Sequence, residues 1–206
     1  MSSAKKVARA IVAADSAFEK IIERSPLCPI GFSPDNSSRK RSPFTSLVHS
    51  VISQQLSTKA AATIISRVET LAGGLSPRSI ARLSEAHLRS VGVSSAKARS
   101  LHELSEVFLN RRSAIHRLDQ LTDSEIEDVL LPIFGIGRWT IEMFLMFSLE
   151  RIDVWPVGDL GVRRGWEKLH RMRTEITPQK LEGLGEKFSP YRSHAAWYCW
   201  RAIELL

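Results

Sequence analysis

Apolar residues recur every three or four positions along most of this chain, which is the spacing of one face of an α-helix. In the segment 4–24 the apolar positions are Val7, Ile11, Ala14, Phe18, Ile21 and Ile22. Further segments begin with a serine or threonine followed by proline, at residues 42–43, 76–77, 177–178 and 189–190. Such a pair supplies an N-cap and a first helical residue. Since the sequence has no run of alternating β-branched residues, the pattern predicts an all-α fold with short turns.

Glycines and polar runs mark where the predicted helices begin and end. Gly73-Gly74 ends a helix that starts at Ala60. Thr122 and Glu125 form the Thr-x-x-Glu pattern of a capping box for a helix that continues to Leu131. Residues 28–41 are predicted to form a loop, which ends in the basic cluster Arg39-Lys40-Arg41. That cluster is either a solvated run or a phosphate contact.

The charge balance favours an anionic partner. The chain has 29 lysines and arginines against 22 aspartates and glutamates, a net charge of +7, and this favours nucleic acid over a membrane surface. Its 206 residues suit one large domain or two small lobes. No apolar stretch is long enough to span a bilayer. Arg9 and Asp15 interrupt the first apolar run, so it does not resemble a secretion signal.

Cysteine usage narrows the candidate cofactors. Cys28 and Cys199 are the only cysteines in the sequence. Two distant thiols provide neither a disulfide framework nor the four ligands of a cysteine-bound iron–sulfur cluster. We therefore expect reduced thiols, a cytoplasmic protein and no iron–sulfur cluster.

The stretch 131–166 carries the residues that suggest chemistry. Gly135-Ile136-Gly137 places two glycines just before an apolar helix that begins near Trp139. Such a turn gathers unpaired backbone N–H groups at the positive end of a helix, where a phosphate binds, although many Gly-x-Gly turns are plain helix C-caps. Asp159 follows Pro156 and Gly158. It is either an ordinary turn residue or a carboxylate placed for chemistry on nucleic acid.

In this stretch the chain resembles the helix-hairpin-helix DNA glycosylases, and among them the 3-methyladenine DNA glycosylase II branch. That branch carries LPGIGxWTA in its hairpin and DxxPxxDLG after the next helix. The matching residues here are Gly135, Ile136, Gly137, Trp139, Thr140, Asp153, Pro156, Asp159, Leu160 and Gly161. Three positions depart from the pattern, because Phe134 replaces the usual proline and Arg138 and Ile141 replace a frequent proline and alanine.

The resemblance covers about residues 30–204 and implies a fold of two helical lobes, with the active site in the cleft between them. It implies a single catalytic domain over residues 1–206, with interleaved lobes and the helix-hairpin-helix at about 124–150. The sequence leaves no room for the N-terminal mixed α/β domain of the bacterial inducible enzyme. We therefore expect a minimal form that consists of the catalytic core. We also expect a monomer.

By this resemblance Asp159 is the catalytic residue. Its carboxylate would stabilise positive charge on the deoxyribose and orient the attacking water. Asp153 is better explained as a cap or turn residue. Relatives that also cleave the DNA backbone have a lysine where this chain has Trp139, and that lysine forms a Schiff base. We therefore expect no lyase activity.

The resemblance also implies a pocket for a nucleotide base that has been flipped out of the duplex. An alkylated purine is cationic, and aromatic faces attract cations. The residues assigned to this pocket are Trp139, Met143, Trp155 and Phe188. Trp197 is a further candidate neighbour, although tryptophans in a helical protein mostly belong to the core. Arg192 and Ser193 match the WxPYRS element of the branch, and we expect them to support the loop that carries Asp159.

DNA contacts are expected at the hairpin and at several basic side chains. The residues assigned to them are Gly135, Ile136, Gly137, Arg138, Thr140, Lys59, Lys97, Arg163 and Arg164. The family also leads us to expect a sodium or potassium ion on the carbonyls of residues 133–137. The turn in ISQQLSTK is expected to enter the minor groove and fill the gap left by the flipped nucleotide. Gln54, Gln55 and Leu56 are the candidate wedge residues, with Gln55 or Leu56 preferred.

The leading hypothesis is a monofunctional DNA glycosylase of base excision repair. It would remove alkylated purines such as 3-methyladenine and 7-methylguanine from double-stranded DNA and leave an abasic site. A glycosylase for deaminated or etheno bases is the alternative among enzymes. A non-catalytic helix-hairpin-helix DNA-binding module would need neither Asp159 nor an aromatic pocket residue beside it. A helical protein-interaction domain would leave the two glycines and the +7 charge without a use.

Overall fold

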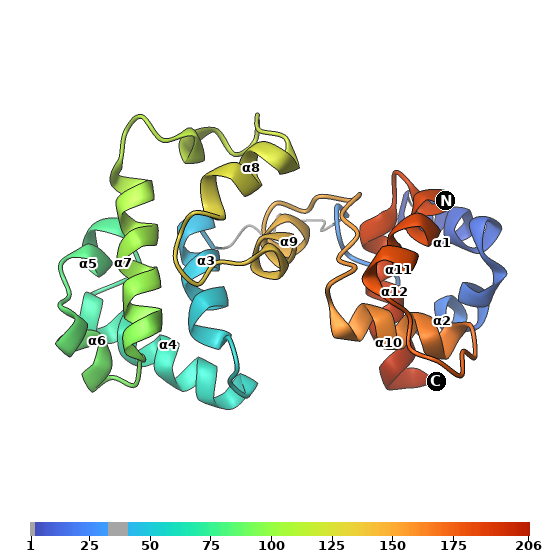
Figure 1. The fold of residues 1–206 in the computed structure, drawn as a ribbon, viewed down its shortest axis with the longest axis horizontal. Helices are drawn as coiled ribbons and strands as arrows, with labels where there is room; N and C mark the ends of the chain where they lie inside the picture. The colour runs from blue at the N-terminus through green and yellow to red at the C-terminus, as the bar shows by residue number, and fades with distance from the viewer. Residues whose placement is uncertain (1–2, 33–40) are drawn as a thin grey trace. The chain divides into compact units, whose positions relative to one another are not determined.

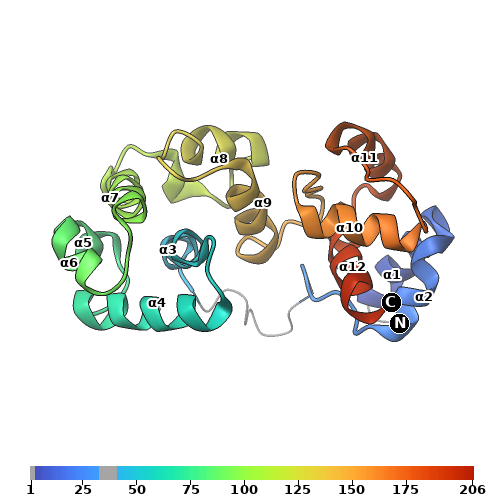
Figure 2. The same ribbon diagram turned by 60° about the horizontal axis from the view of Figure 1, so that its bottom comes forward.

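Helices separated by turns make up the regular structure of the computed structural model, which describes residues 3–32 and 41–206 (Figures 1 and 2). No strand occurs within these ranges, so the prediction of an all-α fold is confirmed. Most of the predicted loop, with Arg39 and Lys40 of the basic cluster, lies outside the described residues. Within them, no helix combines the length and the apolar character needed to cross a membrane.

The chain divides into two compact units. Unit 2 is the continuous segment 39–144 and contains α3 (Pro43–Ser53), α4 (Thr58–Ala72), α5 (Pro77–Ala81), α6 (Glu85–Ser90), α7 (Ser95–Leu109), the 3-10 helix η3 (Ala114–Arg117), α8 (Asp123–Leu130) and most of α9 (Arg138–Phe147). Unit 1 combines residues 1–38 and 145–206 and contains α1 (Ser3–Ala14), η1 (Ser16–Phe18), α2 (Glu19–Arg24), α10 (Leu160–Leu169), α11 (Pro178–Gly185), η4 (Glu186–Phe188) and α12 (Arg192–Leu205).

Serine or threonine is the N-cap residue of many of these helices. The side chains of Ser42, Ser57 and Ser94 each accept a hydrogen bond from the backbone N–H three residues further on. Thr122 and Glu125 form both halves of the predicted capping box at the start of α8. Each such cap satisfies a donor that has no partner inside the helix and stabilises it by about 1 kcal/mol. Local hydrogen bonding therefore explains most of the predicted helix starts.

In unit 2 the helix α3 packs against both α4 and α7 (Figure 1). Its apolar face is fully buried and consists of Phe44, Leu47, Val48, Val51 and Ile52. Complete burial of a side chain of this size contributes roughly 1.5–3 kcal/mol relative to leaving it exposed. The core therefore fixes both ends of α3, including the turn that follows Ser53.

The core of unit 1 is rich in aromatic side chains. Phe18, Trp155 and Phe188 pack around Trp166 with ring centroids 6.1 Å from it in each case. The helices α10 and α12 pack closely at Gly165, where a Cβ atom would lie 2.0 Å from the carbonyl oxygen of Cys199. Only glycine permits that approach, so α12 is held tightly against α10.

Several helix boundaries differ from those predicted by one or more residues, and two of the differences have a local cause. The predicted helix over 4–24 is interrupted at Asp15, whose Oδ1 accepts a hydrogen bond of 3.0 Å from the N–H of Ala17. This local bond competes with the helix and starts η1 instead. The last helix begins at Arg192 rather than at Ser189-Pro190. The Ser189 hydroxyl donates to Asp153 Oδ2 at 2.9 Å and so belongs to a loop contact rather than to a cap.

Candidate active site

Asp159 is the N-cap of α10 and is 91% buried, with 9% of its surface exposed. Its Oδ1 accepts a hydrogen bond of 2.7 Å from the N–H of Val162. The same oxygen accepts a second bond of 2.8 Å from the indole Nε1–H of Trp200. A helix N-terminus stabilises negative charge. The carboxylate predicted to be catalytic is therefore held in one orientation by two donors from different helices.

Trp200 contacts more than the carboxylate. A Cβ atom on Gly161 would lie 2.7 Å from Cδ1 of Trp200 and 3.0 Å from Asp159 Oδ1, so glycine is needed for the indole to reach the start of α10. The indole also packs against Phe147, with ring centroids 5.7 Å apart. Phe147 and Trp200 share a groove of about 410 Å³ with Trp197, Arg201, Ile203 and Glu204. Trp200, which positions Asp159, is therefore part of an aromatic surface.

The loop leading to Asp159 is fastened to the start of α12. Arg192 donates from Nε and Nη2 to the two carboxylate oxygens of Asp153, at 2.8 and 2.9 Å. Ser193 Oγ donates to the carbonyl of Arg151 at 2.7 Å and accepts from the N–H of Val154 at 2.9 Å. Although partial burial would raise the pKa of Asp153, its hydrogen bonds with Arg192 and Ser189 hold that pKa below its ordinary value. The structural roles predicted for Asp153, Arg192 and Ser193 agree with these contacts.

The hairpin between α8 and α9 depends on Gly135. Its φ of +76° lies in the left-handed region, which favours glycine. A Cβ atom there would also lie 2.5 Å from Ser100 Oγ on α7. The N–H of Ile136 donates to the carbonyl of Ile133 at 3.1 Å and closes the turn. The hairpin therefore packs directly on α7 and leads into the first turn of α9, whose N–H groups lack partners within the helix.

Phe134 has a role that the usual proline would not permit. Its N–H donates to Glu103 Oε2 at 2.7 Å, and proline has no such donor. The Arg99 guanidinium lies 4.1 Å from the centre of the Phe134 ring and is paired with Glu103 at 2.8 Å. The hydrogen bond from Phe134 and the pairing with Arg99 lower the pKa of Glu103. The departure from the family pattern is therefore matched by new contacts with α7.

The turn between α3 and α4 presents two of the three candidate wedge residues at the surface. Gln55 is exposed and has a φ of +57°, and Leu56 is also exposed. Gln54 points elsewhere, because its Nε2 donates to the Gly135 carbonyl at 3.0 Å and to Thr140 Oγ1 at 3.3 Å. The structure thus favours Gln55 and Leu56, and not Gln54, as the residues available to another molecule.

A family model described as HhH-GPD superfamily base excision DNA repair protein matches residues 48–190, which hold the turn, the hairpin and Asp159. The chain belongs to the HhH-GPD superfamily. The match covers more than half of the 206 residues, and it includes the hairpin, the motif around Asp159 and the turn that holds the candidate wedge residues.

Individual relatives narrow the branch within the HhH-GPD superfamily. DNA-3-methyladenine glycosylase 1 of Schizosaccharomyces pombe is 34% identical over 178 residues, covering 84% of this chain and 78% of the relative. A solved DNA-3-methyladenine glycosidase from Bacillus halodurans has a TM-score of 0.83 and 36% identity, covering 99% and 90% of the two chains. A 3-methyladenine DNA glycosylase of S. pombe, solved with abasic DNA, has a TM-score of 0.82 and 31% identity over 97% of each chain. The chain is thus a member of the branch that its sequence resembles.

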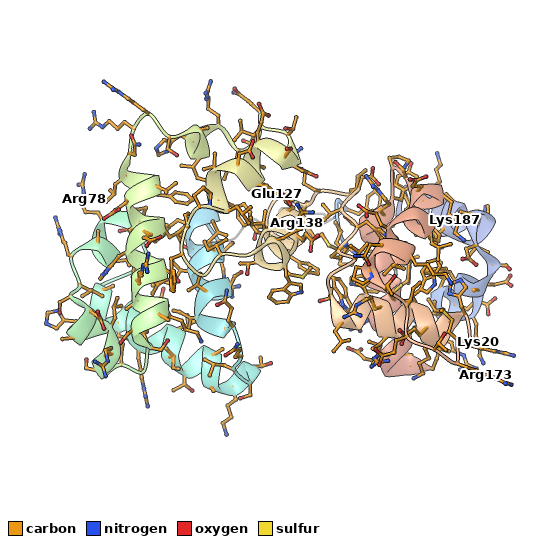
Figure 3. All side chains as sticks on the ribbon, in the orientation of Figure 1. Lys20, Arg78, Glu127, Arg138, Arg173 and Lys187 are labelled. Carbon is orange, nitrogen blue, oxygen red and sulfur yellow. The ribbon has the colours of Figure 1, made fainter. Side chains whose placement is uncertain are left out.

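The basic residues assigned to DNA differ in what they contact. Arg138 is exposed, with Nε 3.6 Å from Glu127 Oε1 (Figure 3). Arg164 is paired with Glu167 and Glu175, so acidic neighbours already neutralise it. Lys59 is exposed near the start of α4, and Arg163 is half-buried on α10. Their contacts with DNA stay predictions, with Lys59 and Arg138 the more accessible of the four.

The Lys97 side chain forms hydrogen bonds with the protein's own backbone. Its Nζ donates to the carbonyls of Ile52 and Gln54, at 2.8 and 2.7 Å. These carbonyls lie at the C-terminal end of α3, where acceptors lack partners within the helix. Burial lowers the pKa of the Lys97 ammonium. The Lys97 ammonium thus already donates to two backbone carbonyls, which a role in neutralising a DNA phosphate does not explain.

Two of the four residues assigned to a base pocket belong instead to the core of unit 1. Trp155 is 8% exposed and donates from Nε1 to the Leu181 carbonyl at 2.9 Å, while Phe188 is 2% exposed. A base cannot stack on rings that the protein already encloses, so the assignment of Trp155 and Phe188 is corrected. Trp139 is 46% exposed and Met143 is half-buried, and their pocket role stays a prediction.

Trp200 and Phe147 were not predicted from the sequence as parts of the site. Trp200 stands 41 residues after Asp159, and no local motif links the two. Phe147 follows Trp139 and Met143 at four-residue intervals on α9 and therefore shares their face of that helix. This spacing was the available signal for Phe147. For Trp200, only the three-dimensional packing of α12 on α10 reveals the contact.

Proposed function

We propose that this chain is a monofunctional DNA glycosylase that hydrolyses the N-glycosidic bond of alkylated purines in double-stranded DNA and leaves an abasic site. The observation that carries the proposal is the carboxylate of Asp159, anchored through Oδ1 by Val162 and Trp200. A binding module would have no need to hold an acidic group against a DNA partner that is itself acidic. Membership of the 3-methyladenine glycosylase branch supports the same substrate class.

The carboxylate acts on charge that develops during the reaction. As the bond between the sugar and the base lengthens, positive charge builds on the deoxyribose ring. The negative charge of Asp159 stabilises this state more than the neutral starting sugar, and so lowers the barrier. Because its orientation is set before the substrate arrives, little reorganisation is needed at that moment. The carboxylate also orients the water that attacks the sugar carbon, and the departing base carries away the electrons of the broken bond.

The aromatic residues suit the leaving group. Methylation at N3 or N7 makes a purine cationic, which both weakens the glycosidic bond and draws the base to an electron-rich ring face. Phe147 and Trp200 supply such faces beside Asp159. Trp139 and Met143 lie on the same face of α9 as Phe147. A flipped base held by stacking needs few specific hydrogen bonds, which fits recognition of several alkylated purines.

Electrostatic binding of the DNA backbone would come from the hairpin and from basic side chains. The N–H groups at the start of α9 can hold a phosphate. The carbonyls of residues 133, 135 and 137 each accept one hydrogen bond from the protein, and a carbonyl oxygen has a second lone pair. Backbone carbonyls of residues 133–137 would therefore suit a sodium or potassium ion, which would add positive charge near a phosphate.

The lack of lyase activity is proposed from Trp139. A lyase of this family uses a lysine amine as the nucleophile at the matching position, whereas an indole cannot form a Schiff base. Borohydride should therefore trap no covalent complex between this protein and lesion-containing DNA. A trapped complex of protein and DNA on a denaturing gel would overturn the monofunctional assignment.

Base release from methylated DNA tests the proposal as a whole. Wild type is expected to release 3-methyladenine and 7-methylguanine, identified by mass, and Asp159→Asn to release them at least about 100-fold more slowly. Asparagine is also a good N-cap, so α10 should remain folded. Asp119→Asn removes the same charge at an exposed position and serves as the control. Equal rates for Asp159→Asn and wild type would refute the catalytic role, and release of deaminated or etheno bases instead would change the substrate.

A further inference from the structure

We propose that Lys97 and Gln54 are positioning residues that lock the Gln55–Leu56 turn and the Gly135 hairpin into one rigid unit, so that insertion of the turn into DNA depends on them. This inference rests on the proposed function. It assigns Lys97 to a role other than phosphate neutralisation and removes Gln54 from the wedge itself.

The first of the two sets of hydrogen bonds joins α7 to the end of α3. Lys97 Nζ lies 2.8 Å from the Ile52 carbonyl and 2.7 Å from the Gln54 carbonyl. Both acceptors lie within the three residues before Gln55, whose φ of +57° is unfavourable for a residue other than glycine. An ammonium held between the two carbonyls fixes the direction in which the chain leaves α3. It therefore maintains the conformation that presents Gln55 and Leu56.

The second set of hydrogen bonds joins the turn to the hairpin. Gln54 Nε2 donates to the Gly135 carbonyl at 3.0 Å and to Thr140 Oγ1 in the first turn of α9 at 3.3 Å. The backbone carbonyl of Gln54 meanwhile accepts from Lys97. One residue thus bridges the end of α3, the hairpin and α9, which are 81 and 86 residues further along the chain.

A single face of α7 supports both loops. Lys97, Ser100 and Glu103 are spaced by three residues and so lie close together on that helix. Ser100 Oγ is the atom that a Cβ on Gly135 would meet, at 2.5 Å. Glu103 accepts from the N–H of Phe134 at 2.7 Å. Because α7 is anchored in the core of unit 2 by Ala98, Leu101 and Leu104, the turn and the hairpin are held at a fixed separation.

Rigidity of this kind matters for a wedge. Side chains at a turn tip must compensate for the stacking lost when a nucleotide leaves the duplex. If the tip were mobile, the entropy cost of ordering it on binding would offset much of the free energy gained from these contacts. Meanwhile a phosphate held at the hairpin sets the register of the DNA. A fixed separation between the two therefore aligns the tip with the nucleotide to be extruded.

The test compares Lys97→Met with wild type in three measurements on the full chain. These are affinity for undamaged duplex as a function of salt, flipping followed by the fluorescence of 2-aminopurine beside an abasic-site analogue, and single-turnover release of methylated purines. Lys97→Met should bind undamaged DNA with wild-type affinity and salt dependence. Its fluorescence change and its release rate at saturating enzyme should fall about 10- to 100-fold, the factor for losing a hydrogen bond to a charged group.

Three further variants make the result decisive. Lys97→Arg keeps a donor for both carbonyls and should recover most of the release rate. Gln54→Leu cuts the bridge without touching charge and should reproduce the Lys97→Met defect. Arg78→Met removes one positive charge from α5 in the same unit (Figure 3) and should behave as wild type. If Lys97→Met fails to show a cooperative thermal transition, the Gln54→Leu result decides.

A double-mutant comparison separates positioning from a direct contact. If Lys97 acts through the turn, Lys97→Met should have no further effect on release in a chain that already carries Gln55→Ala and Leu56→Ala. Additive losses would overturn the proposal. Weaker binding of all DNA by Lys97→Met, with a salt slope lower by about one, would identify a phosphate contact instead.

The proposed function and this inference fail in different ways. Wild type that releases no methylated purine refutes the substrate, but the 2-aminopurine signal still reports on insertion of the turn. Wild type that is active, together with a Lys97→Met chain of equal flipping and release rates, refutes the positioning role alone.

Discussion

The indole N–H of Trp200 lies 2.8 Å from Oδ1 of Asp159 and donates a hydrogen bond to it. The bond joins α12 to the first turn of α10, so the orientation of the carboxylate depends on a residue 41 positions away. Asp159 would cap α10 without this bond, because Val162 donates to the same oxygen. The second donor is therefore not needed for the helix, and its role is to hold the carboxylate.

Replacing Trp200 by phenylalanine removes the donor and retains an aromatic ring. We expect the single-turnover rate of base release to fall roughly 10-fold or more, as for the loss of a hydrogen bond to a charged group. The midpoint of thermal unfolding should change little, since the α10 cap remains. In the Asp159→Asn background the same replacement should have no additional effect on the rate. An undiminished rate for Trp200→Phe alone would mean that Val162 suffices to orient the carboxylate.

Gly161→Ala tests the close packing at the same place. The added methyl group would lie 2.7 Å from Trp200 Cδ1 and would push the indole away from Asp159. We expect base release to fall at least as far as in Trp200→Phe, together with lower stability in denaturant titrations. Gly183→Ala on α11 is the matched control, because a Cβ there meets nothing within 4 Å. That control should be neutral or stabilise the helix by about 0.5–1 kcal/mol.

Asp15 joins α1 to α10 and η4 and makes stability depend on pH. Its Oδ2 pairs with His170 Nε2 and Lys187 Nζ, each at 2.8 Å. Partial burial alone would raise the pKa of Asp15, but the hydrogen bonds from Lys187 and His170 hold it below the ordinary 3.8. A carboxyl with a lowered folded pKa stabilises the fold above its ordinary pKa, and this contribution is lost as the pH falls through the folded value.

Asp15→Asn is therefore expected to reduce the free energy of unfolding by roughly 1–2 kcal/mol at pH 7. The difference from wild type should shrink as the pH is lowered below 3.8. Urea titrations at several pH values measure it. The exposed Asp119→Asn variant should show no such pH-dependent difference. A deficit that stays constant with pH would indicate lost packing rather than lost charge.

Both cysteines should be inert in the folded protein. Cys28 and Cys199 are buried free thiols. Burial raises the pKa of the Cys28 thiol to about 12 and that of Cys199 still further. Since the thiolate is the reactive form, neither should react with a disulfide reagent at pH 8 until guanidinium unfolds the chain. Rapid modification of one thiol in the native protein would show that its segment opens locally.

The helices and their starts could be predicted because they depend on neighbours in the sequence. The Ser42 cap and the Thr122–Glu125 capping box each involve residues three positions apart. Asp159 could be predicted as the candidate catalytic residue because the family motif around it is contiguous. The break at Asp15 was not predicted, since a carboxylate that bonds to Ala17 competes with a helix for which the apolar spacing was favourable.

Burial and long-range partners could not be predicted. Trp139 and Trp155 are the same residue type and close in sequence, yet one is exposed and the other lies in the core of unit 1. Trp155 is buried because α10 and α11 pack against it, and the residues adjacent to it in the sequence do not indicate this packing. Lys97 looked like a surface cation because its acceptors, the carbonyls of Ile52 and Gln54, are more than forty residues earlier in the chain.

The discontinuity of unit 1 has a consequence for biosynthesis. Unit 2 is one continuous segment and can fold as soon as residue 144 has left the ribosome, whereas α1 and α2 must wait for α10 and α12. Until then the apolar side chains of Val7, Ile11 and Phe18 have no core to enter. Protease digestion of stalled nascent chains should therefore find unit 2 protected first. The Asp159 carboxylate is oriented last, because Trp200 must be synthesised before it can donate to Asp159.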